Sequence, residues 1–103
     1  MLTFIETKLF SRLADEHLGE DGLLALQVHL LAQPEIGKVI PGSGGVRKLR
    51  WAMPGRGKRG GLRVIYFLRL KQEEIWLLTL YAKNVSDNIS SSVLKKIKAS
   101  IDG

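Results

Sequence analysis

The sequence contains no cysteine, which excludes a disulfide framework and a zinc site built on thiolates. Long apolar runs are also missing, because no stretch approaches the roughly 20 apolar residues that a membrane-spanning helix needs. Residues 1–6 have no basic cluster ahead of an apolar segment, so we expect no secretory signal and a cytoplasmic protein without a membrane partner. No repeat, linker or low-complexity tract interrupts residues 1–103, and we expect them to form a single domain.

Side chains that commonly carry acid–base or metal chemistry are scarce. Only two histidines occur, His17 and His29, and both fall in segments expected to be helical. No set of carboxylates and histidines has the spacing of metal ligands. The glycine-rich segment Gly55–Gly61 lacks the Gly-x4-Gly-Lys-Ser/Thr order of a phosphate-binding loop. We therefore expect neither a metal ion nor a cofactor.

Positive charge is concentrated in the middle of the chain. Residues 1–44 carry three basic and six acidic side chains, a net of −3, and residues 72–103 carry four of each. Residues 45–71 carry nine basic side chains and no acidic one, a net of +9. The whole chain has a net charge of +6, so this segment supplies all of the excess positive charge. A block of cations without carboxylates attracts a polyanion such as nucleic acid. The alternative is a solvated basic face that only keeps the protein soluble.

The first half of the chain predicts a strand and two helices. Leu2–Ile5 is a short apolar run typical of a strand, and Thr7 is placed to cap a helix over Lys8–His17. The chain is expected to break at residues 18–22 and to form a second helix that ends before Pro34. The predicted apolar faces contain Leu9, Phe10 and Leu13 in the first helix, and Leu23, Leu24, Leu26, Leu30 and Leu31 in the second.

Three strands and a helix are predicted after a turn at Pro41–Gly45. Alternation in the strand Val46–Trp51 puts Lys48 and Arg50 on one face and Leu49 and Trp51 on the other. Leu62–Leu68 and Glu74–Tyr81 follow, and the second of these runs is apolar on both faces, as in a central strand. The last predicted helix begins at Ser90 or Ser91 and faces the core with Val93, Leu94, Ile97 and Ile101.

The predicted order is therefore β-α-α-β-β-β-α. Short loops between the last three strands favour antiparallel pairing. Helices before and after a run of strands indicate the α+β class. We expect an antiparallel sheet with two N-terminal helices packed on it and a C-terminal helix.

Cations alone can support one kind of nucleic-acid chemistry. RNA carries its own nucleophile, the 2′-hydroxyl, and fixed arginines or lysines can stabilise the charge that develops on the phosphate during cleavage. A lysine close to other cations releases its proton more readily and can act as a general base. A ribonuclease without metal or histidine is therefore chemically possible for this chain.

Three segments resemble one branch of a known toxin superfamily. They are Gly44–Ala52, Gly55–Tyr66 and Leu78–Asn84, and the string Gly-Lys-Arg-Gly-Gly-x-Arg at residues 57–63, followed by two apolar residues and Tyr66, is the most specific part. These segments and the element order resemble the HigB-type branch of the RelE/ParE superfamily. The resemblance implies the toxin of a type II toxin–antitoxin pair, a ribosome-dependent endonuclease that cuts mRNA in the ribosomal A site. It also implies a cognate antitoxin, often a HigA-like helix-turn-helix protein, as partner.

The resemblance also implies roles for individual residues. Lys48 and Arg50 match the cations of a middle strand, Arg63 matches the arginine that contacts the scissile phosphate, and Lys83 and Asn84 match a polar group after the last strand. These five are the predicted catalytic residues, with Lys48 as the general base. The predicted contacts to mRNA and ribosomal RNA are Arg47, Arg56, Lys58, Arg59 and Tyr81.

The chain departs from the family pattern in two places. Some relatives use a tyrosine in the C-terminal segment, and this chain has none after Tyr81, so Tyr66 or Tyr81 is the candidate to replace it. Val85 stands where the family often has glutamate. Two other functions stay open: a non-catalytic member of the fold that only binds RNA or protein, and a gyrase-targeting toxin of the ParE-like branch.

Overall fold

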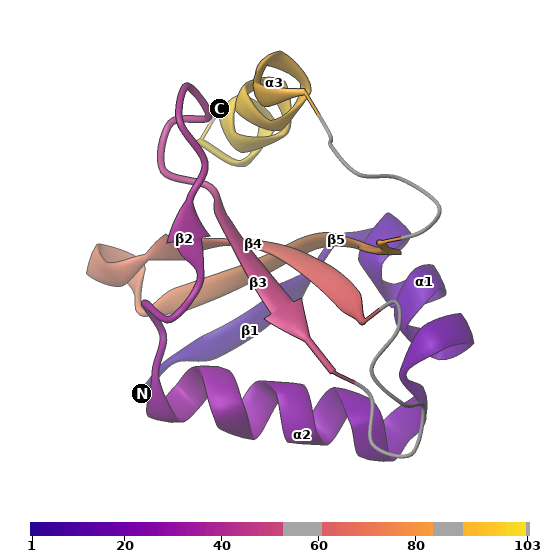
Figure 1. Cartoon of the computed structure of the whole chain (residues 1–103). Coiled ribbons are helices and arrows are strands. Elements are labelled where there is room, and N and C mark those ends of the chain that lie inside the picture. Colours follow the sequence, from indigo (N-terminus) through magenta and orange to yellow (C-terminus); the bar gives the residue numbers. More distant parts are fainter. Residues whose placement is uncertain (53–60, 84–89, 103) are drawn as a thin grey trace.

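The computed structural model describes residues 1–52, 61–83 and 90–102 of the chain. In chain order the elements are β1 (Thr3–Glu6), α1 (Lys8–His17), α2 (Gly19–Ala32), β2 (Lys38–Val39), β3 (Arg47–Trp51), β4 (Leu62–Arg69), the 3-10 helix η1 (Leu70–Gln72), β5 (Glu74–Ala82) and α3 (Ser91–Asp102) (Figure 1). The α+β class and the order of the predicted elements are confirmed. The sequence did not predict the short strand β2.

The strands form one mixed sheet in the order β1-β5-β4-β3-β2. The pairs β2–β3, β3–β4 and β4–β5 are antiparallel, as predicted from the short connections for the last two pairs. The prediction that the whole sheet is antiparallel was wrong, because β1 pairs with β5 in parallel. These two strands lie far apart in the sequence, so no tight turn forces them to run in opposite directions. The strand β5 lies between β1 and β4, which fits its apolar side chains on both faces.

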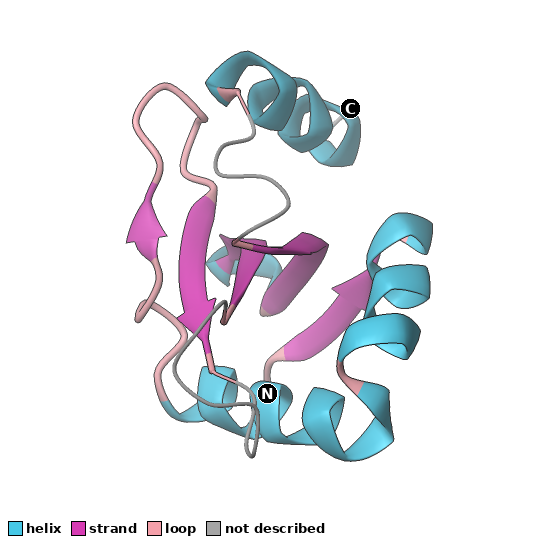
Figure 2. Cartoon of the chain, turned by 45° about the vertical axis from the view of Figure 1, so that its right-hand side comes forward, coloured by secondary structure: helices cyan, strands magenta, loops and turns pink. Residues whose placement is uncertain are grey.

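Two apolar cores lie on the two faces of this sheet. On one face α1 and α2 pack against a cluster that contains Phe10, Leu26, Leu30, Tyr66 and Leu77. On the other face α3 covers a smaller cluster of Val46, Ile65, Leu78 and Leu94. Figures 1 and 2 show α2 and α3 on opposite sides of the strands. Layers on both faces leave only part of the sheet open to solvent.

The hydroxyl of Thr7 fixes the start of α1, as the sequence predicted. Its Oγ1 accepts a hydrogen bond from the Phe10 backbone N–H at 3.0 Å and donates one to the Leu78 carbonyl at 2.7 Å. One side chain therefore caps the helix and ties it to β5. The break after α1 is shorter than expected, because α2 begins at Gly19, whose φ of +69° suits a residue without Cβ.

Both predicted helical faces were too broad. Leu9 is 42% exposed, and Leu24 and Leu31 are 59% and 47% exposed. An α-helix has 3.6 residues per turn, so residues four apart lie on the same side. In α2 this side buries Leu26 and Leu30, while Leu24 and Leu31 lie on the outer side. The apolar composition of α2 hid this division, because both of its sides are apolar.

The C-terminal helix packs much as predicted. The Leu94 backbone N–H donates to the Ser90 carbonyl at 3.1 Å, which places Ser90 at the N-cap position. Leu94 is buried, and Ile97 and Ile101 pack beside it, whereas the side chain of Val93 lies outside the described residues. Across the described ranges we find no helix with the length and apolar character needed to span a bilayer.

Candidate functional site

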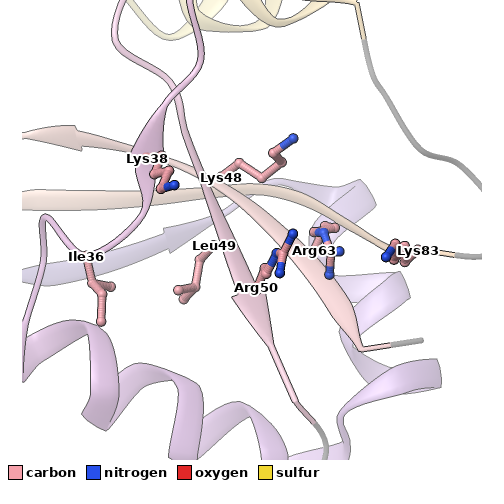
Figure 3. Close-up of a pocket in the computed structure, with 7 residues that line it drawn as sticks. All are labelled: Ile36, Lys38, Lys48, Leu49, Arg50, Arg63 and Lys83. Atoms are coloured by element: carbon pink, nitrogen blue, oxygen red, sulfur yellow. The ribbon is translucent and has the colours of Figure 1, made fainter. Parts of the chain in front are cut away.

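A cavity of about 750 Å³ opens on the β2–β3–β4 part of the sheet. Among the described residues, its lining consists of Ile36, Lys38, Lys48, Leu49, Arg50, Arg63 and Lys83 (Figure 3). Five of these seven side chains are cations, and none is a carboxylate. We call this feature the cationic cavity. Cations from three strands and from the end of β5 therefore face a common space.

Strand register places like charges side by side in this cavity. Arg50 of β3 pairs directly with Arg63 of β4, and Lys38 of β2 pairs directly with Lys48 of β3. Directly paired residues point to the same face of a sheet, and equal charges in such positions are mutually destabilising. Within the ranges that the structure describes, no carboxylate forms an ion pair with any of the five cations. The arrangement opposes folding and favours an anionic ligand.

The structure brings together the predicted catalytic residues that it describes. Lys48, Arg50, Arg63 and Lys83 all line the cationic cavity, as alternation in β3 indicated for the first two. In Figure 3 the Lys48 amino group points away from the end groups of Arg50 and Arg63. Asn84, the fifth predicted catalytic residue, lies outside the described residues.

The predicted RNA contacts are placed differently. Arg47 lies on the other face of β3 from Lys48, and its Nη1 donates to the carbonyls of Glu35 and Gly37 at 3.0 and 2.8 Å. The structure thus gives Arg47 a role in holding the α2–β2 connection, and its contact with RNA stays a prediction. Tyr81 pairs with Arg63 across β5 and β4 and packs against the core under α3. Arg56, Lys58 and Arg59 fall in a part of the chain that is not described.

Tyr66 is a core residue and not a substitute for a C-terminal tyrosine. Its side chain is fully buried on the α1–α2 face. The phenol accepts a hydrogen bond from the Gly37 N–H and donates one to the Pro34 carbonyl, each at 2.8 Å. Burial raises the pKa of the Tyr66 phenol above its usual value, and the hydrogen bond from Gly37 opposes this shift. The hydroxyl is therefore occupied in holding the segment that precedes β2.

Lys38 is the functional candidate that sequence reasoning missed. It follows the buried Gly37 and belongs to a strand of only two residues, which is too short to show alternation. The available signal was weak: a lysine before Val39 and Ile40, between Pro34 and Pro41. Pairing with Lys48 brings Lys38 to the cavity, and that pairing depends on tertiary structure.

The cavity is suited to binding a phosphodiester. Arginine offers a planar fork of donors that matches two phosphate oxygens, and lysine adds a mobile point charge. Ile36 and Leu49 contribute an apolar edge. Among the described residues, we find no cluster of three or more histidine, aspartate or glutamate side chains placed to hold a metal ion.

A protein-family model matches most of the chain. The family model described as the RelE toxin of the RelE/RelB toxin–antitoxin system matches residues 3–101. The match includes every strand of the fold, α1, α2, α3 up to residue 101, and all five cations of the cavity. It does not distinguish the HigB-type branch from other branches.

Proposed function

The chain belongs to the RelE toxin family of toxin–antitoxin systems, and we propose that it acts as a ribosome-dependent mRNA endonuclease. The observation that carries this proposal is that Lys48, Arg50, Arg63 and Lys83 line one cavity, whose described lining residues include no carboxylate. Fixed cations aimed at a developing oxyanion supply a large share of the stabilisation in phosphoryl chemistry.

The proposed reaction uses the RNA as its own nucleophile. The 2′-oxygen attacks the adjacent phosphorus, the bond from phosphorus to the 5′-oxygen breaks, and a 2′,3′-cyclic phosphate and a 5′-hydroxyl result. Arg50 and Arg63 would bind the non-bridging oxygens. Lys48 would accept the proton of the 2′-hydroxyl, and Lys83 would donate a proton to the departing 5′-oxygen. The amino group of Lys48 must swing toward the two arginines to do so, which its flexible stem allows.

The remaining parts of the proposal follow from the resemblance to HigB-type toxins. The substrate would be the mRNA codon in the ribosomal A site, with Arg56, Lys58 and Arg59 as contacts to ribosomal RNA and Asn84 as a fifth catalytic residue. The RelE family pairs its toxins with antitoxins, and here we propose a HigA-like helix-turn-helix antitoxin. Residues 1–103 would act as one domain, since β1 and β5 from distant parts of the chain share a sheet.

Replacing Arg63 tests this function. Primer extension on translated mRNA after expression of the wild-type protein should show cuts within codons. The variant Arg63→Ala should lower that cleavage by about 100-fold or more, because one lost oxyanion donor typically costs ~100- to 1,000-fold in rate. Arg12→Ala removes the same charge from an exposed position on α1 and should cut like the wild type.

Other outcomes would redirect the assignment. Near wild-type cutting by the Arg63→Ala protein would remove Arg63 from the mechanism. Absence of cuts by the wild-type protein, together with retained RNA binding, would leave the non-catalytic binding module. Absence of cuts together with inhibition of gyrase would place the protein in the ParE-like branch.

A further inference from the structure

The cationic cavity is wider than one phosphate requires. Arg50 and Arg63 form one directly paired set, and Lys38 lies diagonally from Arg50 across β2 and β3, two residues further along β3. Diagonal neighbours of this kind are about 7–8 Å apart, within reach of long side chains. Successive phosphates of an extended RNA strand have a separation of the same order.

We infer that Lys38 forms a second phosphate subsite, which binds the RNA phosphate next to the one held by Arg50 and Arg63. This inference rests on the proposed function and adds a residue to it. Lys38 would contribute to RNA binding and to the alignment of the RNA strand. The other four cations of the cavity would contact the reacting atoms. Figure 3 shows Lys38 on the β2 side of the cavity, across from Lys83.

The backbone beside Lys38 is held from both sides. The Gly37 N–H donates to the Tyr66 hydroxyl at 2.8 Å, and the Gly37 carbonyl accepts from Arg47 at 2.8 Å. A Cβ at position 37 would come within 2.7 Å of the Tyr66 ring, so the chain passes this ring as closely as glycine allows. Further along, the Ile40 N–H donates to the Val46 carbonyl at 2.8 Å. These contacts fix the backbone on both sides of Lys38, so the side chain starts from a fixed place on the β2 side of the cavity.

Edge position offers a simpler explanation for this lysine. Lysines on edge strands discourage pairing with a second chain, and β2 is one of the two edge strands of this sheet. That role asks only for a charge at the edge. It gives no reason for Lys38 to share a cavity with four other cations, directly opposite Lys48.

The test uses the full chain and ribosomes programmed with a synthetic mRNA. Lys38→Ala should raise KM about three- to tenfold with kcat within twofold of the wild type, as expected for one exposed charge contact. The slope of log affinity against log salt should fall by about 0.7, the value for one phosphate on a single strand. Lys38→Arg should restore KM, and Lys71→Ala, which removes an exposed lysine of η1 outside the cavity, should change neither value.

A modified substrate locates the contact. A neutral methylphosphonate is placed at the linkage 5′ or 3′ of the cut site, one at a time. At one of the two positions the methylphosphonate should weaken substrate binding by the wild-type protein and leave binding by the Lys38→Ala variant unchanged. If the wild type cuts, either of two results refutes the second subsite. One is that the two methylphosphonates weaken substrate binding by the Lys38→Ala variant equally, and the other is that the variant has the KM of the wild type. If the wild type does not cut this mRNA, the proposed function has failed instead.

Discussion

The Tyr66 hydroxyl connects the stability of the fold to the placement of β2. Tyr66→Phe deletes the group that accepts from the Gly37 N–H and donates to the Pro34 carbonyl. Gly37 is buried, so its N–H loses its partner without gaining water, whereas Pro34 is half-buried and its carbonyl can be hydrated. A buried donor without a partner costs about 1–3 kcal/mol. We therefore expect the free energy of unfolding to fall by about 2 kcal/mol.

Urea and thermal unfolding measure this change. Fluorescence of Trp51 and Trp76 reports the transition, and the dependence on urea concentration should keep its slope. For a domain of about 100 residues, each kcal/mol corresponds to a Tm shift of roughly 4–8 °C, so the expected loss is on the order of 8–16 °C. A loss below about 0.5 kcal/mol would show that water replaces the phenol and would refute this reasoning.

The pH dependence gives the same prediction an internal control. Burial raises the pKa of Tyr66 in the folded protein above the usual value of 10.0. The contribution of the hydroxyl is therefore complete below about pH 10 and is lost as the pH rises through the folded-state pKa. Lysine titration affects both proteins alike. The difference in stability between wild type and Tyr66→Phe should shrink above pH 10, and a constant difference would contradict the assigned cause.

Two further substitutions test the anchoring of α1 and of β2. Thr7→Val removes both hydrogen bonds of Oγ1 and should lower the free energy of unfolding by about 1–2 kcal/mol, whereas Thr7→Ser keeps the hydroxyl and should unfold close to the wild type. Equal urea midpoints for the valine and serine variants would contradict this role. Gly37→Ala should cost about 1–3 kcal/mol through overpacking, because the new Cβ would lie 2.7 Å from Cε1 of Tyr66. A calorimetric Tm equal to that of the wild type would show that the ring yields.

Much of the fold was predictable because its signals are local. The cap of α1 depends on one hydroxyl three residues before Phe10, and alternation in β3 follows from the pleat of a strand. The faces of α2 were mispredicted because the helix carries apolar residues on all of its sides, so sequence spacing could not separate the buried Leu26 from the exposed Leu24.

The cavity was predictable only in part. Alternation placed Lys48 and Arg50 on one face, and the resemblance pointed to Arg63 and Lys83. The same block of positive charge suggested Arg47, which the structure turns to the backbone carbonyls of Glu35 and Gly37. Charge density along the sequence does not tell which face a side chain takes.

The sequence alone determined the excess of cations between residues 45 and 71, the absence of thiolate chemistry and the face that each residue of β3 presents. Tertiary structure decided which cations meet. Pairing of β2 with β3 brought in Lys38, and pairing of β3 with β4 set Arg50 against Arg63. Within one strand, local backbone geometry makes side chains alternate between the two faces of the sheet. The residue that lies next to each of them on the neighbouring strand is set by hydrogen bonds between segments distant in sequence.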